Sequence, residues 1–226
     1  PLFERQGRKV SLTTTGEYML VYSRRMLALL KDAEDAAARL QRIETGNLTI
    51  GLVGTTTYFI PALLNQFLKE HEGIEVKMMV GNRSELVQWL QNSEVDIAIM
   101  GRAPEELPTR AEPFAANPLV FVAAPEHSMA GETGLRAEDL RQQSIIVREP
   151  GSGTRSAMES FFLQAKLQPR LGMVLPTNDA IKQAVMANLG LGFLSLHTIA
   201  MELQAKRLVV LPVLGAPLVR AWNVVH

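Results

Sequence analysis

The stretch LTIGLVGTTTYFIPALLNQFLKEHEGIEVKMMVG, residues 48–81, indicates the fold class of this chain. It begins and ends with runs rich in Val, Ile and Leu, typical of buried strands, at 48–54 and 74–81. Between them, residues 58–71 place apolar side chains at the three- and four-residue spacing of an amphipathic helix. Two strands joined by a helix over short connections predict a parallel sheet with a right-handed crossover. The 226-residue chain should therefore be an α/β protein.

The same alternation continues to the end of the chain. A second helix and a third strand follow directly at 84–92 and 95–101, and after a Pro-rich region the pattern starts again. The further segments predicted as strands are 118–127, 144–149, 171–176 and 208–213, and those predicted as helices are 137–143, 156–166 and 178–190. Asn178 should cap the last helix and Gly190 should end it. This alternation of strands and helices, interrupted by the Pro-rich region, predicts two similar α/β lobes with a boundary near residues 117–118.

Residues 16–45 are predicted to form one long helix with a single apolar seam. Thr13, Thr14 or Thr15 can cap its start, and Gly46 can end it. The heptad seam comprises Met19, Tyr22, Met26, Leu29, Ala33, Ala36, Leu40 and Ile43. Such a seam can pack against its own domain or against a second copy of the chain. We favour the second copy, because only a short segment precedes the helix.

The composition excludes several classes of protein. Lys and Arg number 23 and so do Asp and Glu, so the net charge gives no sign of a nucleic-acid partner. The chain has no cysteine, which excludes disulfides, thiolate catalysis and zinc–sulfur sites. We find no apolar run of about 18 residues and no signal peptide, and expect a cytoplasmic protein without membrane contact. Since the sequence does not begin with Met, we expect a piece of a longer protein.

Polar turns follow four of the predicted strands, and each contains glycine. Their sequences are VGTTTYF, VGNRSEL, IMGRAPE and REPGSGTRS. In open α/β sheets ligands bind beyond the carboxyl ends of the strands, so these turns should converge on one crevice. Helix N-termini, hydroxyls and arginines all favour a carboxylate or a phosphate there. Each Ser or Thr could instead serve only as a helix cap, but four turns together predict a shared anion pocket.

The sequence offers no catalytic constellation. REPGSGTR lacks the lysine of a P-loop, and GSG is not the G-x-S-x-G turn of a nucleophilic serine. His197 is interpreted as structural, and Asp96 as a turn or hydrogen-bonding residue rather than a general base. No metal-ligand spacing is present. We therefore expect neither an enzyme nor a cofactor or metal.

The N-terminal segment PLFERQGRKVSLTTTGEYML resembles the end of the winged helix-turn-helix domain of LysR-type transcriptional regulators. The family pattern LFER.GR.V.LT..G is fully present, and the long helix follows where the family has a dimerising linker. LTIGLVGTTTYFIPALLNQF and GLGFLSL resemble its effector domain. The resemblance implies a two-lobed fold like that of type 2 periplasmic binding proteins, with the ligand between the lobes.

This resemblance divides the chain into five parts. They are a winged helix-turn-helix remnant (1–15), a linker or coiled-coil helix (16–45), lobe I (47–118), lobe II (119–222) and a return toward lobe I (223–226). The recognition helix lies outside this sequence, so DNA would be bound through the missing N-terminal domain. The DNA-backbone contacts expected here are Arg5, Arg8 and Lys9. A homodimer or homotetramer is implied.

The resemblance also implies the effector-binding residues. They are Thr55, Thr56, Thr57, Gly101, Arg102, Glu149, Ser152, Thr154, Arg155 and Asn178. MGRAP and REPGSGTR are most similar to regulators of carbon-fixation (RuBisCO) operons, whose implied effectors are anionic: phosphorylated sugars, phosphoglycolate, or nucleotides such as NADPH. Arg102 and Arg155 facing each other across the cleft would suit a doubly charged anion. The alternatives are a LysR-type regulator that senses a carboxylate or aromatic acid, and a solute-binding protein for a small anion.

Overall fold

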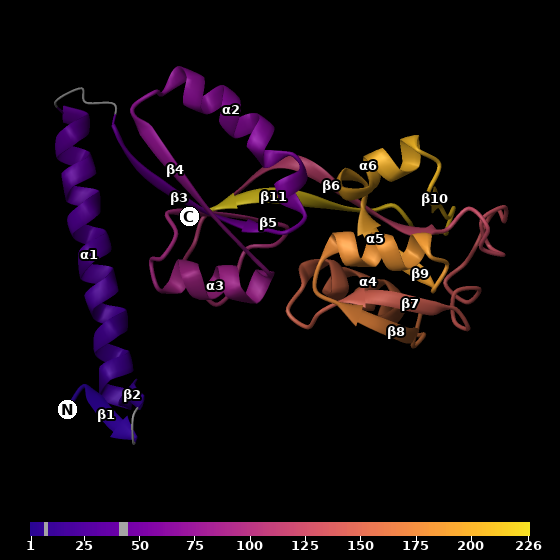
Figure 1. Ribbon diagram of the computed structural model, residues 1–226, viewed down its shortest axis with the longest axis horizontal. Coiled ribbons are helices and arrows are strands. Elements are labelled where there is room, and N and C mark those ends of the chain that lie inside the picture. Colours follow the sequence, from indigo (N-terminus) through magenta and orange to yellow (C-terminus); the bar gives the residue numbers. More distant parts are fainter. Residues whose placement is uncertain (7–8, 41–44) are drawn as a thin grey trace.

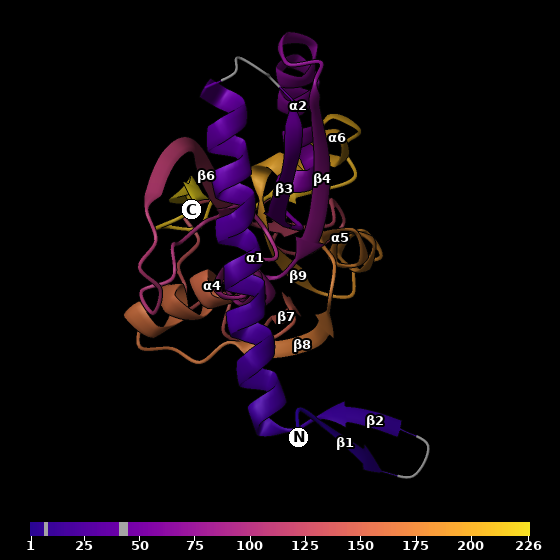
Figure 2. The same cartoon turned by 90° about the vertical axis from the view of Figure 1, so that its left-hand side faces the viewer.

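The computed structural model describes residues 1–6, 9–40 and 45–226, with no description of the side chains at 6, 32 and 35–40. An antiparallel hairpin, β1 (Phe3–Gln6) and β2 (Lys9–Leu12), leads into the long helix α1 (Thr14–Leu40). Figure 1 shows this helix standing beside a two-lobed body. In Figure 2 the hairpin lies at the end of α1 away from the lobes.

The α1 helix begins where the threonine run predicted. Of the three candidate caps, Thr13 makes the contact, because its Oγ1 accepts from the Gly16 N–H at 3.1 Å. The described seam residues Met19, Tyr22, Met26 and Leu29 are all exposed, at 44–67%. Seam positions Ala36, Leu40 and Ile43, as well as Arg8, fall outside what is described of the side chains. An apolar seam left open to solvent favours a partner over packing within the chain.

A different face of α1 is attached to lobe I by ion pairs. Arg24 Nη1 lies 2.8 Å from Glu94 Oε1, and Lys31 Nζ lies 2.9 Å from Asp96 Oδ1. Asp96 also accepts from the Thr49 backbone N–H at 2.6 Å, which confirms its interpretation as a hydrogen-bonding residue. The helix is thus tied to the first lobe while its apolar seam stays exposed.

Lobe I is the predicted alternation of strands and helices. Its elements are β3 (Gly46–Val53), the 3₁₀ turn η1 (Thr56–Tyr58), α2 (Ile60–Glu70), β4 (Ile74–Gly81), α3 (Arg83–Gln91) and β5 (Ile97–Met100). Strand β3 pairs with β4 and with β5, both in parallel. Buried Ile50, Leu52 and Ile99 pack with Ile60 of α2, and Leu86 of α3 covers the other face.

Lobe II repeats this arrangement around a larger core. Its elements are β7 (Ser144–Arg148), α4 (Gly153–Gln164), β8 (Arg170–Leu175), α5 (Asn178–Met186), β9 (Leu191–Ser195), α6 (Leu196–Gln204) and β10 (Val209–Val210). Strand β7 pairs in parallel with β8 and β9. Phe121, fully buried, contacts the rings of Phe161, Phe162 and Phe193 at the centre of the core.

Two long antiparallel strands join the lobes (Figure 1). They are β6 (Ala111–Ala123) and β11 (Leu218–Val225). Strand β11 also pairs with β5 of lobe I, and β6 pairs with β9 of lobe II. Within the described residues, both lobes therefore share one sheet, in the order β4-β3-β5-β11-β6-β9-β7-β8 with β10 beside β6.

Three predicted segments differ from the structure. Residues 137–143 form successive turns instead of a helix, because bonds such as Leu140 N to Ala137 O span three residues, not four. The strand predicted at 118–127 begins earlier and ends earlier, since its first half pairs with β11 across the lobe boundary. In the run 208–213 only Val209–Val210 form a strand, and Val213 makes an isolated bridge with Leu135. Helix α5 is capped by Thr177, whose Oγ1 accepts from Ala180 N–H, instead of by Asn178.

Of the helices in the described part of the chain, none is both long and apolar enough to cross a membrane.

Gly190 is required at the start of β9, and Gly190→Ala should destabilise the fold. Its φ is +154°, and an added Cβ would lie 2.4 Å from the Ser144 carbonyl oxygen. We expect a loss of about 1–3 kcal/mol in the free energy of unfolding, measured with urea. Gly131→Ala is the matched control, because an added Cβ there meets nothing within 4 Å. Equal stability of the two variants would contradict this account.

Candidate ligand cleft between the lobes

A cavity of about 180 Å³ lies between the lobes at the carboxyl ends of the parallel strands. It has walls from both lobes and a floor from the crossing strands. Of the residues predicted from sequence, it is lined by Thr55, Gly101, Arg102, Ser152 and Thr154. Further polar lining residues, outside the predicted set, are Asn82, Arg83, Asn117, Arg148, Ser156, Ser160, Arg220 and Trp222.

The N-terminus of α4 opens onto this cavity. Ser152 is buried and caps the helix, with its Oγ 3.5 Å from the Arg155 N–H. Gly153 and Thr154, the first helical residues, line the cavity. The first N–H groups of a helix lack partners within the helix and attract anions. Gly151, at φ +87°, lets lobe I approach, since an added Cβ would lie 2.8 Å from Ser84 Oγ.

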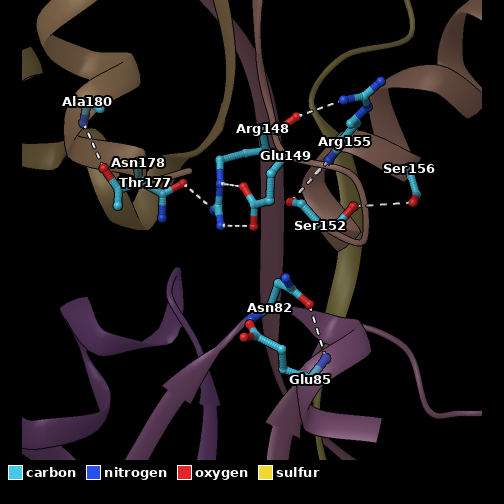
Figure 3. Close-up of polar contacts among 10 residues, drawn as sticks. All are labelled: Asn82, Glu85, Arg148, Glu149, Ser152, Arg155, Ser156, Thr177, Asn178 and Ala180. Carbon is cyan, nitrogen blue, oxygen red and sulfur yellow. Dashed lines mark hydrogen bonds and ion pairs between the residues drawn. The ribbon is translucent and has the colours of Figure 1, made fainter. Parts of the chain in front are cut away.

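Arg148 is buried at the end of β7, and its charge is already balanced. Its Nε and Nη2 donate to the two Glu149 carboxylate oxygens at 2.7 and 2.9 Å. Its Nη1 donates to Asn178 Oδ1 at 3.1 Å, as Figure 3 shows. Glu149 and Asn178, both predicted ligand residues, are therefore engaged by Arg148. They line an adjoining cavity that also includes Thr57.

The expectation that Arg155 faces Arg102 across the cleft is wrong. Arg155 Nε donates to Glu159 Oε1 at 2.8 Å and its Nη1 donates to the Arg148 carbonyl at 3.2 Å. Figure 3 shows its guanidinium turned away from that of Arg148. Arg155 does not line the main cavity. Arg102 does, but it is exposed and paired with Glu105.

Arg83 and Arg220 are the cavity arginines without a carboxylate partner among the described residues. Arg83 begins α3 and only donates to the Ala103 carbonyl at 3.4 Å. Arg220 lies on β11, opposite Asn117 of β6. Arg83 stood in a turn that the sequence had marked for anion binding. Arg220 had no such local signal, because it lies in none of the four polar turns marked in the sequence.

The three threonines after β3 have different roles. Thr55 lines the main cavity. Thr56 Oγ1 donates to the Val53 carbonyl at 2.8 Å, and Thr57 Oγ1 donates to the Gly54 carbonyl at 2.9 Å. These two hydroxyls therefore brace the turn at the end of the strand, and Thr56 touches neither cavity.

A polar cluster closes the lobes against each other beside the adjoining cavity. Tyr58 of lobe I donates its hydroxyl to Asp179 Oδ1 of lobe II at 2.8 Å. Lys182 Nζ lies 4.9 Å from the centre of the Tyr58 ring and 2.9 Å from both Asp179 and Glu202 carboxylate oxygens. Opening the lobes would separate Tyr58 from both partners.

The pKa values of this cluster reflect its contacts. Burial and the bond to Asp179 raise the pKa of Tyr58. The hydrogen bonds from Lys182 and then from Tyr58 lower the pKa of Asp179. Burial by itself would lower the pKa of Lys182, but its bonds to Asp179 and Glu202 outweigh burial and raise it. At neutral pH the cluster therefore holds a neutral phenol between a charged carboxylate and a charged amine.

The described residues contain no metal-binding cluster, and the contacts of His197 are structural. No cluster of three or more His, Asp or Glu side chains there could hold a metal ion. His197 Nε2 lies 2.9 Å from the Ala116 carbonyl oxygen, and its ring packs at a tilt against Phe59, with the ring centres 5.2 Å apart. These contacts give His197 the structural role that was expected of it.

Comparisons with known proteins place this geometry in one family. Residues 41–226 match the family described as the LysR substrate binding domain. The chain is 41% identical over 225 residues to the regulator CfxR of Cupriavidus necator, covering 100% of this chain and 71% of CfxR. It is 42% identical to the RuBisCO operon transcriptional regulator of Allochromatium vinosum, covering 100% of this chain and 74% of that protein.

One solved structure combines fold similarity with substantial sequence identity. The regulatory domain of CcmR from Synechocystis PCC6803, in complex with 2-PG, superposes with a TM-score of 0.77 and is 36% identical. The match covers 80% of this chain and 88% of the CcmR domain. A two-lobed effector-binding domain is therefore the fold of this chain as well.

Asp179→Asn should lower the free energy of unfolding at neutral pH. In acid the variant and the parent should become equally stable. A carboxylate with a lowered native pKa stabilises the fold above its unfolded pKa of about 3.9, and the contribution is lost as pH falls through the native pKa. Because the Asp179 side chain is 73% exposed, we expect only about 0.2–1 kcal/mol at pH 7. Urea unfolding at several pH values measures the difference.

The Glu138→Gln control removes an exposed carboxylate that has no ion pair in the described structure. It should leave stability unchanged. The difference in free energy of unfolding between the parent and Asp179→Asn should shrink as pH falls. If it grows instead, the cluster does not favour the charged carboxylate.

Proposed function

Because this chain belongs to the LysR family of transcriptional regulators, of the kind that controls RuBisCO operons, we propose that its interlobe cleft senses an anionic, phosphorylated metabolite. The convergence of two arginines without carboxylate partners on the N-terminus of α4 carries this proposal. Arg83 reaches the cavity from lobe I, Arg220 from a crossing strand, and Gly153 and Thr154 from lobe II. A ligand held by all three would bridge the lobes.

The charge balance of the cavity favours a phosphate monoester. Arg148 and Arg102 each have a carboxylate neighbour, whereas Arg83 and Arg220 leave about two positive charges uncompensated. A phosphate monoester carries about 1.5 to 2 negative charges at pH 7 and offers three acceptor oxygens. Arginine binds such oxygens in pairs. A monocarboxylate would leave one of the two guanidinium groups without a counter-ion.

Two further observations support a phosphorylated effector over the alternatives. The related CcmR domain was solved with 2-PG. The cavity has one aromatic side chain, Trp222, which gives little surface for an aromatic acid. The curated relatives described above are named as transcriptional regulators, and this favours a sensor over a solute-binding protein or an enzyme.

The ligand acts by favouring one arrangement of the lobes. Bridging contacts stabilise the closed arrangement together with the Tyr58–Asp179 bond, and a tenfold preference shifts the equilibrium by about 1.4 kcal/mol. Lobe I carries α1 through the Arg24–Glu94 and Lys31–Asp96 ion pairs. In a homodimer or homotetramer paired through the α1 seam, lobe movement would change the spacing of the DNA-binding heads and thus promoter binding. In the hairpin, Arg5 and Lys9 would contact the DNA phosphate backbone.

Arg83→Ala and Arg220→Ala should each abolish the thermal stabilisation that 2-phosphoglycolate gives to the parent protein. A ligand at 100 times its Kd stabilises by about 2.7 kcal/mol, so the shift in Tm is measurable by differential scanning fluorimetry. Arg207→Ala is the control, because Arg207 is exposed on lobe II and lines neither cavity. If both cleft variants respond like Arg207→Ala, the assigned cavity is wrong.

A further inference from the structure

Outside the crossing strands, a single side-chain hydrogen bond joins the two lobes in the described part of the chain. The Tyr58 hydroxyl of lobe I donates to Asp179 Oδ1 of lobe II at 2.8 Å. The hydrogen bonds and ion pairs of the other side chains on α2 to α5 stay within one lobe. Apart from the crossing strands, this bond is therefore the polar contact that resists opening of the lobes.

The turn after β3 carries two aromatic residues to lobe II. Tyr58 ends η1, and Phe59 follows it as the residue before α2. The centre of the Phe59 ring lies 5.2 Å from that of His197, at the start of α6, and 6.1 Å from that of Trp222. Trp222 lines the main cavity. Tyr58 is thus positioned by a neighbour that packs against lobe II and against a residue of the cavity.

Lobe II presents a fixed acceptor to this tyrosine. Lys182 is 5% exposed, and its Nζ lies 2.9 Å from carboxylate oxygens of both Asp179 and Glu202. The same ammonium group lies 4.9 Å from the centre of the Tyr58 ring, within the range of a cation–π attraction. A charged acceptor also makes a stronger hydrogen bond to a hydroxyl than a neutral one does. The hydroxyl and the ring of Tyr58 therefore both favour closed lobes.

This contact between the lobes lies outside the cavity assigned to the effector. The lining of the main cavity does not include Tyr58, Asp179 or Lys182, and the first two line the adjoining cavity instead. A ligand held by Arg83, Arg220 and the N-terminus of α4 would touch none of the three. An influence of Tyr58 on ligand binding would therefore act through the relative position of the lobes.

From these contacts, and on the basis of the proposed function, we infer that Tyr58 sets the affinity for the effector without touching it. Its hydroxyl and ring hold the lobes in the closed arrangement, and the ligand binds to that arrangement because its contacts come from both lobes. The apparent Kd of a ligand rises in proportion as the population of the binding-competent arrangement falls. Tyr58 is thus a positioning residue, and loss of its hydroxyl opens the lobes and weakens binding.

Distances between the lobes test the first half of this inference. Asn65→Cys on α2 and Gln183→Cys on α5 place spin labels at exposed positions on both lobes, and the chain has no cysteine of its own. By double electron–electron resonance, Tyr58→Phe should enlarge the longer-distance population at least about twofold. Tyr18→Phe, the same change at an exposed tyrosine of α1, should leave the distances unchanged. Asp179→Ala removes the acceptor and should give the same opening if Tyr58→Phe fails to fold.

Affinity measurements test the second half. By isothermal titration calorimetry, 2-phosphoglycolate should bind to Tyr58→Phe about three- to tenfold more weakly than to the parent protein, and to Tyr18→Phe as tightly as to the parent. The double variant Tyr58→Phe/Asp179→Ala should bind about as weakly as the weaker single variant, because both changes break the same contact. At saturation, the ligand should restore the parent distances in Tyr58→Phe, which a merely destabilised fold would not show.

The outcomes separate this inference from the proposed function. If 2-phosphoglycolate binds to the parent and to Tyr58→Phe equally well, the inference fails. It also fails if the distances in Tyr58→Phe match those in Tyr18→Phe. In both cases, binding to the parent that depends on Arg83 still supports the proposed function. If the parent binds no phosphate ester, the proposed function fails, and the claim about affinity fails with it even where the distances change.

Discussion

The pairing of β6 with β11 is the constraint on which the rest of this structure depends. These two strands carry the sheet from lobe I to lobe II, so the carboxyl ends of strands from both lobes face one cavity. The same pair forms the cavity floor and brings Asn117 and Arg220 side by side. A separate sheet in each lobe would leave the polar turns without this shared floor. A ligand on it can therefore report on the relative position of the lobes.

Charge pairing then decides which arginines in the cleft can bind an anion. Arg148 and Arg155 lie in the glycine-rich segment that most resembles an anion site, yet both are held by glutamates. Their bonds fix the end of β7 and the start of α4, so they shape the cavity instead of supplying free charge. The uncompensated charge comes from Arg83, on the lobe I wall, and from Arg220, on the floor formed by the crossing strands.

Local sequence signals correctly predicted which residues reach the cavity when their position depends only on one strand, the turn after it and the next helix. Thr55, Ser152 and Thr154 follow buried strands and reach the cavity as expected. Arg155 was mispredicted, although Glu159 stands four residues later on the same helix, a spacing that places the two side chains together. Arg220 and Trp222 could not be assigned, because their face of β11 is set by pairing with β6, about 100 residues earlier.

The sequence by itself determined the α/β lobes, the long N-terminal helix with its apolar seam and the family to which the chain belongs. These features are encoded by periodicity, turn residues and a contiguous motif, all of which are local. The tertiary structure alone decided which guanidinium groups are neutralised and that Tyr58 bonds to Asp179 across the lobes. The physical reason is that burial and ion pairing depend on distances between segments, and the crossing strands set those distances.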